Sequence, residues 1–266
     1  MSMTTISANA QAAALILAQR RLLGQQGPRL PEALRPADLD AAMQIQLAIV
    51  PLMGDEVGGW KCGTPGPDKL VVAPIYARTI HAEGEAPCPV WAHDGAVRVE
   101  PELAFVLGVD LPVRDQPYEP AEVDAAILAT HLALELIDSR YSDPSVLTFA
   151  DKLADGLVNQ GLFLGPQVDA ELACHTHVMP IAVWVDGLPQ PARAGQHPDP
   201  LPRLPLYWLV EYLREQGLGM RAGQVVITGS YAGTFALPVG QRVAMRYGEL
   251  GSLEVCFEAR SRDPVA

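Results

Sequence analysis

The clearest strand of the sequence is Val97-Arg98-Val99-Glu100-Pro101-Glu102-Leu103-Ala104-Phe105-Val106-Leu107. Alternate residues of a strand share a face, so this stretch separates into two faces. The odd-numbered face is wholly apolar. The even-numbered face carries Glu100 and Glu102, about 7 Å apart along the strand, and continues with Ala104 and Val106. The strand is therefore expected to be covered on one face and at least partly buried on the other.

Two carboxylates on a partly buried face repel each other and lose solvation. A bound Mg²⁺ or Mn²⁺ would offset both effects, because these hard cations bind carboxylate oxygens. A solvent-exposed strand end is the alternative, with Arg98 neutralising one of the two glutamates. The pattern thus predicts a metal site at Glu100 and Glu102 and leaves the surface alternative open.

A third carboxylate, Glu135, lies among the aliphatic residues of the segment 132–137. A lone buried glutamate is rare unless it is paired or ligates a metal. Arg140 and Lys152 are the obvious partners for a buried ion pair. Glu135 would otherwise complete a site of three glutamates, with positions left for substrate and water.

Three further segments carry groups that can bind or transfer protons. Lys61 is flanked by glycines in the run 58–66, and it can hold a substrate carboxylate or, if burial lowers its pKa, donate a proton. Asp155 can orient a ligand or a lysine, and Thr228-Gly229-Ser230 can bind an oxyanion. The structural alternatives are a surface lysine at a turn, an aspartate that caps the backbone, and an ordinary turn.

The order of expected elements divides the chain into a helical N-terminal region, residues 1–57, and a β-rich body, residues 58–266, which together form one compact unit. Helices are expected over 7–23, 36–50 and 205–216, and helix also over 120 to about 131. The segment 132–137 either continues that helix or becomes a strand. Strands are expected over 225–228, 242–247 and 252–257.

Charge and composition exclude several classes of protein. Nineteen basic against 31 acidic residues give a net charge of −12, which disfavours binding to nucleic acid or to an anionic membrane. Apolar runs are shorter than the roughly 20 residues of a membrane span, and Arg20 and Arg21 follow the first apolar run, unlike a secretory signal. Four scattered cysteines indicate free thiols and a cytoplasmic protein.

Together these segments resemble the 2-keto-4-pentenoate hydratase and 4-oxalocrotonate decarboxylase branch of the fumarylacetoacetate hydrolase superfamily. The resemblance rests on the order and spacing of five motifs and covers about residues 10–258. In chain order these are Gly59-Trp60-Lys61-x-Gly63, Glu100-Pro101-Glu102-Leu103-Ala104-Phe105-Val106-Leu107-Gly108, Glu135-Leu136-Ile137-Asp138-Ser139-Arg140, Ala154-Asp155, and Ala222-Gly223-Gln224-Val225-Val226-Ile227-Thr228-Gly229-Ser230.

The resemblance implies an α+β fold, a mixed β-sandwich roll with a helical N-terminal part. It implies Mg²⁺ or Mn²⁺ held by Glu100, Glu102 and Glu135, and Lys61 and Asp155 as catalytic residues. Lys61 and the 228–230 loop would contact the substrate. It also implies a homo-oligomer, with association with a related decarboxylase conceivable.

The implied reaction is a metal-dependent hydration in the catabolism of aromatic compounds. Water adds to a 2-hydroxy-2,4-dienoate and gives a 4-hydroxy-2-oxo acid. The alternatives are a decarboxylase of the 4-oxalocrotonate type and a non-catalytic binding or assembly partner. A hydrolase of C–C bonds is less expected, because residues 1–57 contain no histidine to activate water. Two positions depart from the related hydratases: residues 71–76 lack an acidic residue, and Gly156 replaces an asparagine.

Overall fold

The computed structural model describes residues 6–84 and 87–261. The α-helices are α1 (Ala8–Leu23), α2 (Leu39–Ile49), α3 (Pro120–Ala126), α4 (Phe149–Ala154), α5 (Ala170–His175) and α6 (Leu204–Glu215). The strands are β1 (Val57–Gly66), β2 (Lys69–Tyr76), β3 (Ile80–Ala82), β4 (Cys88–Val90), β5 (Ala96–Leu107), β6 (Ile127–Ile137), β7 (Asn159–Val168), β8 (Val178–Val185), β9 (Leu188–Pro189), β10 (Arg193–Gln196), β11 (Val225–Ile227), β12 (Phe235–Pro238), β13 (Arg242–Tyr247) and β14 (Gly251–Ala259).

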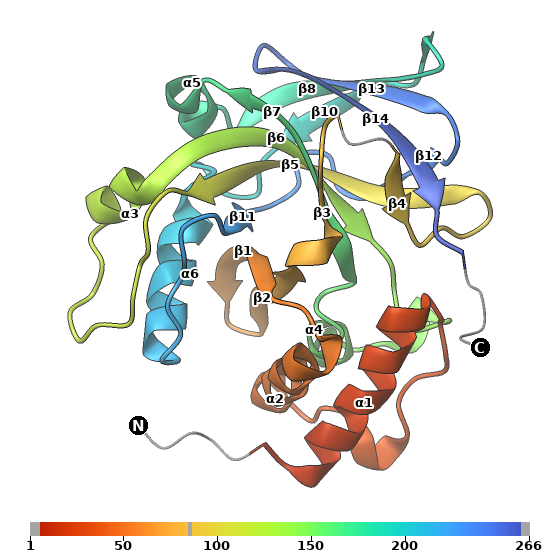
Figure 1. The fold of residues 1–266 in the computed structure, drawn as a ribbon, viewed down its shortest axis with the longest axis vertical. Coiled ribbons are helices and arrows are strands. Elements are labelled where there is room, and N and C mark those ends of the chain that lie inside the picture. Colours follow the sequence, from red (N-terminus) through yellow and green to blue (C-terminus); the bar gives the residue numbers. More distant parts are fainter. Residues whose placement is uncertain (1–5, 85–86, 262–266) are drawn as a thin grey trace.

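The first sheet has the strand order β2-β1-β11-β5-β6-β7-β3, and β5 lies near its centre (Figure 1). One edge of β5 pairs with β6 along nearly its whole length. The other edge pairs with β12 over residues 96–99 and with β11 over residues 104–106. Between these two pairings the loop of residues 228–234 runs beside β5. This interruption is the place where Glu100 and Glu102 lie.

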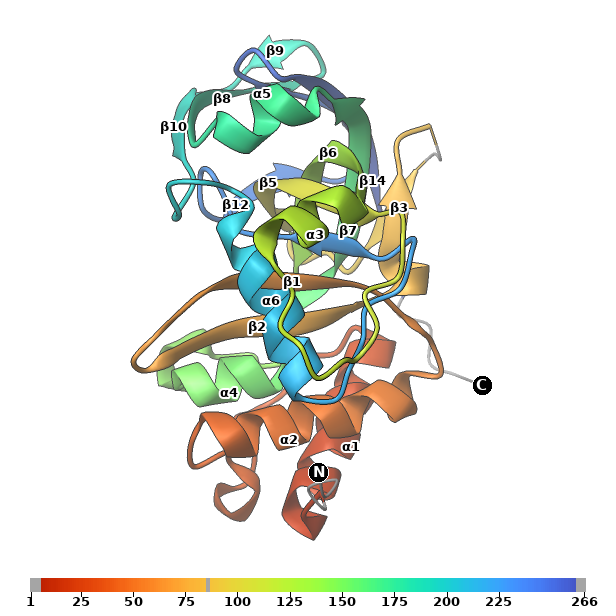
Figure 2. The same ribbon diagram turned by 90° about the vertical axis from the view of Figure 1, so that its left-hand side faces the viewer.

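The second sheet has the order β10-β8-β13-β14-β4, with β9 added to β8. In Figure 2 it forms the upper tier, the first sheet the middle tier, and α1, α2 and α4 the lower tier. The apolar face of β5 and the inward residues of β13 and β14 share one buried core that includes Phe105, Met245 and Phe257. The α+β roll with helices at its N-terminus is therefore confirmed.

The N-terminal helices form a second core with β2 and α4, in which Ala14, Ile45 and Tyr76 are buried. Ser7 caps α1 by accepting a hydrogen bond from the Ala10 amide, as its position in the sequence suggests. The second helix begins later than expected, because Asp38 accepts from the Ala41 amide and serves as its N-cap. The division of the chain at residues 57 and 58 stays a prediction, and its outermost residues lie outside those described.

The expected helix from residue 120 to about 131 is wrong beyond Ala126. The capping box of Glu119 and Glu122 starts α3, but Ile127 already has extended backbone angles and begins β6. From Leu132 onward β6 is buried on both faces, so its apolar residues show no alternation with polar ones. A run of this kind fits a buried helix or a buried strand equally well, and pairing with β5 and β7 selects the strand.

All four cysteines are free, as predicted. Among the described residues we find no helix with the length and apolar character needed to cross a membrane.

Candidate active site

The register of β5 against β6 brings the three predicted glutamates together. Glu100 lies directly opposite Glu135, and Glu102 lies two residues further along the same face of β5. One carboxylate oxygen from each of the three lies within 4.8 Å of the other two. Glu102 and Glu135 are buried, and Glu100 is partly buried. Two strands thus bring three carboxylates together, although Glu102 and Glu135 are 33 positions apart in the sequence.

Lys61 reaches this cluster from β1. Its Nζ lies 2.6 Å from Oε1 and 2.7 Å from Oε2 of Glu135, and Asn159 donates a further hydrogen bond of 2.9 Å to Oε1. Parallel pairing of β1 with β11 sets this position. Gly59 permits the pairing, because a Cβ there would lie 2.3 Å from the Val225 carbonyl oxygen.

The partner of Glu135 is therefore Lys61, which corrects the two partners considered from the sequence. Arg140 pairs instead with Asp155, and Lys152 lies on the wall of a different cavity. Arg98, the other cation considered as a neutralising group, is exposed and leaves both β5 glutamates to other partners.

The loop between β11 and β12 supplies those partners. The Gly229 amide donates a 2.7 Å hydrogen bond to Oε2 of Glu102, and the Thr234 hydroxyl donates to Oε1 of Glu100. The Tyr231 amide donates to the Pro101 carbonyl and holds the loop against β5. The loop takes the place of a strand here, so that its donors point at the carboxylates.

Burial and mutual repulsion shape the electrostatics of the cluster. Burial, together with the charges of Glu135 and Glu100, raises the pKa of Glu102 well above its ordinary value. Burial also raises the pKa of Glu135, although the Lys61 ammonium opposes the change. For Lys61, burial favours the neutral amine, but the three carboxylates outweigh it and raise the pKa. Lys61 is therefore a charged donor at neutral pH, and the condition that burial lowers its pKa is not met.

A cavity of about 430 Å³ opens beside the carboxylates. Its wall includes Lys61 and Glu100, and the predicted substrate-binding residues Thr228, Gly229 and Ser230. The remaining wall residues that carry polar groups and were missed from the sequence are Thr64, Lys69 and Asp199. Lys69 and Thr64 enter because β1 and β2 form a hairpin. Nothing in the local sequence around Asp199 indicated this position.

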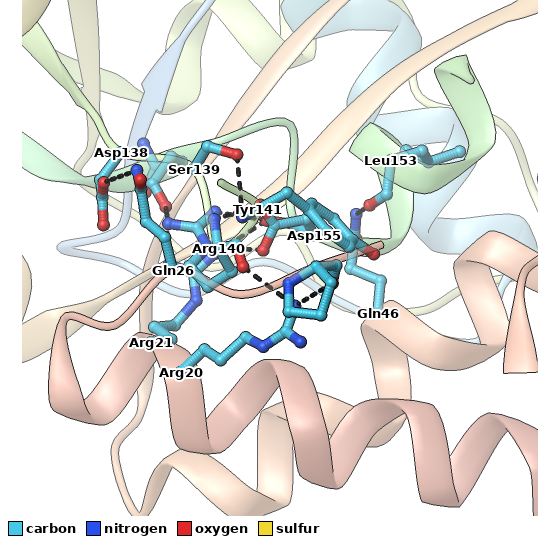
Figure 3. A network of polar contacts seen from close by, with 12 residues as sticks. Arg20, Arg21, Gln26, Gln46, Asp138, Ser139, Arg140, Tyr141, Leu153 and Asp155 are labelled. Carbon is cyan, nitrogen blue, oxygen red and sulfur yellow. Dashed lines mark hydrogen bonds and ion pairs between the residues drawn. The ribbon is translucent and has the colours of Figure 1, made fainter. Parts of the chain in front are cut away.

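Asp155 lies in a neighbouring network of polar contacts (Figure 3). Its Oδ1 accepts a 2.5 Å hydrogen bond from Nε of Arg140, and its backbone carbonyl accepts from Arg140 and from Arg21 of α1. Asp155 ends α4, and Leu157 two residues later offers its carbonyl to Lys61 at 3.4 Å. The structure thus connects Asp155 to Lys61 through the backbone, and its predicted catalytic role stays a prediction.

The structure gives the surroundings of Gly156 and of residues 71–76, where the sequence departs from the resemblance. Gly156 has φ +67°, and the Arg21 guanidinium lies 3.0 Å from where a Cβ would be. Of residues 71–76, Val71 lies on the cavity wall. The cavity wall is therefore apolar at this position.

Comparisons with known proteins agree with the motifs. No protein-family model matches the chain. A 2-keto-4-pentenoate hydratase from Paraburkholderia xenovorans is 26% identical over 169 residues, which are 64% of this chain and 62% of that protein. A 4-oxalocrotonate decarboxylase from a Pseudomonas species is 28% identical over 171 residues, 61% of each chain. The matches thus span less than two thirds of the length of these relatives.

Solved structures share the fold, one of them over nearly the whole chain and another over about three quarters of it. The 4-oxalocrotonate decarboxylase of Pseudomonas putida G7, complexed with magnesium and adipate, superposes with a TM-score of 0.75 at 18% identity and covers 97% of this chain and 100% of that one. The fumarylpyruvate hydrolase of Pseudomonas aeruginosa, in complex with Mn²⁺ and pyruvate, has a TM-score of 0.50 at 17% identity, over 76% of this chain and 89% of that one.

The chain therefore has the fold of the fumarylacetoacetate hydrolase superfamily, and other neighbours are described as members of that family. Its sequence relatives within the superfamily are the 2-keto-4-pentenoate hydratases and 4-oxalocrotonate decarboxylases, as the motifs indicate.

Proposed function

We propose that the protein is a divalent-metal-dependent lyase. It adds water to a 2-hydroxy-2,4-dienoate of the 2-keto-4-pentenoate type and gives a 4-hydroxy-2-oxo acid. The observation that carries the proposal is the meeting of Glu100, Glu102 and Glu135 beside Lys61 on the wall of a cavity. The names of the sequence relatives support the choice of reaction.

The residues present fit a divalent cation. Three carboxylates and one ammonium leave two negative charges in a partly buried space, and Mg²⁺ or Mn²⁺ would balance them with oxygen ligands of the kind these ions prefer. Metal complexes of proteins with this fold support the same assignment. When bound, the cation supplies Lewis-acid stabilisation of the negative charge that develops on the substrate's carboxylate and 2-oxygen.

The side chains around the cavity would donate protons, bind the substrate and position one another. Lys61 stays protonated and can donate a hydrogen bond or a proton to the substrate, while Glu135 holds its ammonium in place. The Thr228 and Ser230 hydroxyls, on the cavity wall, would bind substrate oxygens, because the Gly229 amide already donates to Glu102. Asp155 acts as a positioning residue, because it fixes the backbone that carries the carbonyl acceptor of Lys61.

A 2-oxo acid decarboxylase is the second candidate function. It needs the same electron sink and loses CO₂ instead of gaining water. A decarboxylase matches the sequence at 28% identity, close to the 26–27% of the hydratases. The wall around Val71 also lacks an acidic residue. A non-catalytic binding partner is disfavoured because the complete set of glutamates is retained together with Lys61.

The first test is isothermal titration of Mg²⁺ and Mn²⁺ with and without oxalate, a mimic of the enolate of a 2-oxo acid. We expect oxalate to bind only in the presence of metal. In Glu102→Gln the metal affinity should fall at least about tenfold, and metal-dependent turnover should be lost with the fold intact. Glu254→Gln, on the exposed edge of β14, is the control and should bind metal normally.

Full activity in Glu102→Gln would contradict the proposal. Oxalate affinity that is the same with and without metal would contradict it as well. Product analysis then separates the reactions. Hydration adds the elements of water to a 2-hydroxydienoate, whereas decarboxylation of an oxalocrotonate releases CO₂.

A further inference from the structure

Asp199 lies on the wall of the cavity of about 430 Å³ that opens beside the glutamates. It is partly buried, and its carboxylate has no hydrogen bond or ion pair within the parts of the chain that the structure describes. Pro198 has a fixed φ, and Pro200 restricts the backbone of the residue before it. Asp199 is therefore an unpaired carboxylate that a stiff segment holds in the wall of the candidate active site.

The segment that carries Asp199 packs against the loop that holds the glutamates of β5. Nδ1 of His197 accepts a 3.0 Å hydrogen bond from the Asp199 amide, which closes a tight turn. Gly229 lies so close to Pro198 that a Cβ on the glycine would be 2.9 Å from Cγ of the proline. The Gly229 amide donates to Glu102, so the two segments meet at the carboxylate cluster.

The charge of Asp199 also acts on β1, the strand that carries Lys61. Burial raises the pKa of Cys62 well above its ordinary value, and the charges of Glu102 and Asp199 add to this increase. Cys62 follows Lys61 in the sequence, and both lie on the wall of the cavity. The Asp199 carboxylate is therefore close to β1, beside the cavity that Lys61 also lines.

The other titratable groups of this wall are poorly suited to take a proton from water. The two glutamates of β5 are the proposed metal ligands and already accept hydrogen bonds. Lys61 is protonated, and burial keeps the Cys62 thiol protonated as well. Lys69 is an ammonium donor with no acceptor. Among the described residues of the wall, Asp199 remains as the group that can act as a base.

His197 adjoins the same site, but both of its ring nitrogens are engaged. Burial lowers the pKa of His197, so the ring is neutral at pH 7. Because Nδ1 accepts from the Asp199 amide, the proton of the neutral ring is on Nε2, which lies 3.4 Å from the Thr228 hydroxyl oxygen. The imidazole therefore orients Thr228 and fixes the Asp199 turn, and it has no nitrogen left to accept a proton.

We propose that Asp199 is the general base that takes a proton from the attacking water in the hydration reaction. The inference rests on the proposed function and adds the residue that activates water. As the water oxygen bonds to C4 of a 2-oxo-3-enoate, the C3–C4 π electrons move toward the 2-oxygen, and a water proton passes to the Asp199 carboxylate. The carboxyl group then returns this proton to C3 while the C2 carbonyl re-forms. The product has gained one water molecule, and Asp199 is again a carboxylate.

The test follows both halves of the reaction in the Mg²⁺-loaded full chain. Proton NMR after addition of 2-hydroxypenta-2,4-dienoate measures the dienol, the 2-oxo-3-enoate formed by ketonisation and the 4-hydroxy-2-oxo acid formed by hydration. In Asp199→Asn we expect hydration to slow at least about 100-fold, the usual effect of losing a general base. Ketonisation needs no activated water and should stay within about threefold, as should the affinity for oxalate, so that the 2-oxo-3-enoate accumulates.

Asp68→Asn is the matched control. Asp68 also follows a proline, but it is exposed in the turn between β1 and β2 and does not line the cavity. This variant should hydrate the substrate at the wild-type rate. Asp199→Glu keeps a carboxylate on a longer side chain and should hydrate at least about tenfold faster than Asp199→Asn. Equal rates in the two variants at position 199 would overturn the inference, because the carboxylate would then have no part in the step.

The remaining outcomes separate this inference from the proposed function. Hydration by Asp199→Asn within about threefold of the wild-type rate would overturn the inference and leave the proposed function standing. Joint loss of hydration and of oxalate binding would also overturn it, since Asp199 would then be needed to build the site. If the proposed function is wrong, the wild-type protein itself will form no 4-hydroxy-2-oxo acid from the dienol, and the inference falls with it.

Discussion

Glu102 has a buried carboxylate that either a proton or a bound cation can neutralise. Its carboxylate is buried, lies near two others and receives the Gly229 amide. Without a cation, a proton is the simplest way to neutralise it, and this is why its pKa is raised.

The raised pKa of Glu102 predicts a pH dependence of stability. The folded protein holds this proton at pH values where the unfolded chain, with an ordinary pKa near 4.5, has released it. Stability from this group is therefore complete below about pH 4.5 and is lost as the pH rises through the folded-state pKa. With a chelator present, urea unfolding from about pH 5 to 8 should show wild type losing stability relative to Glu102→Gln.

Saturating Mn²⁺ should remove this relative loss, because the cation replaces the proton as the neutralising group. A difference between wild type and Glu102→Gln that stays constant over the whole pH range would contradict the interpretation.

The sequence predicted the glutamates of the site, but it did not predict which residues form hydrogen bonds and ion pairs with them. The alternation of β5 placed Glu100 and Glu102 on one face, and the isolation of Glu135 among aliphatic residues marked it as a buried carboxylate. Its pairing with Lys61 depends on β11 bringing β1 alongside β5. That contact joins residues 74 positions apart, and no local pattern contains it.

Among the connecting elements, the short link between α4 and β7 is strained. Leu157 and Val158 have φ of 52° and 59°, a region that residues other than glycine adopt uncommonly and β-branched residues such as Val158 rarely. The Leu157 carbonyl accepts a hydrogen bond from Lys61, and Val158 lines the cavity of about 590 Å³ whose wall also contains Lys152. Backbone strain of this kind persists where the surrounding structure enforces it and often accompanies functional sites.

Relief of this strain should stabilise the protein. Val158→Gly is expected to raise the free energy of unfolding by about 1 kcal/mol, since the strain removed exceeds the added flexibility of the unfolded chain. Val185→Gly, in the regular strand β8, is the control and should lower it by a similar amount. Chemical denaturation measures both. Destabilisation by Val158→Gly as large as that of the control would show that the link is not strained.

Helices and strands could be predicted from the sequence where capping residues, proline starts or alternating apolar residues mark them. Capped or proline-started helices and alternating strands, such as β13, match their expected ranges within a few residues. The segment that became β6 was ambiguous because both of its faces are buried. The long-range pairing that selects a strand there lies outside any short window of sequence.

In the molecule as a whole, α1 is joined to the body by buried charge as well as by apolar packing. Nη1 of Arg21 donates to the Asn159 carbonyl at 2.7 Å. Its Nη2 donates to the Asp155 carbonyl at 3.0 Å, and both of these residues are labelled in Figure 3. Burial and the neighbouring Arg140 lower the pKa of Arg21 to about 10. The helix thus contacts the segment that also orients Lys61.

Removal of this link should weaken the whole molecule. Arg21→Met keeps the volume of the side chain but leaves two buried carbonyls without these donors, so we expect a loss of about 2 kcal/mol in the free energy of unfolding. Arg221→Met, which removes an exposed ion pair with Glu56, should cost less than about 1 kcal/mol. Equal losses in the two variants would show that Arg21 contributes only as a surface residue.

The position of β11 between β1 and β5 also affects folding during translation. Residues 225–227 are synthesised late, yet they join the strand that carries Lys61 to the strand that carries Glu102. A nascent chain that has not reached them can pair β5 with β6 and gather the glutamates, but it has no strand to hold Lys61 beside them. During translation, the three glutamates can therefore come together before a strand is present that holds Lys61 beside them.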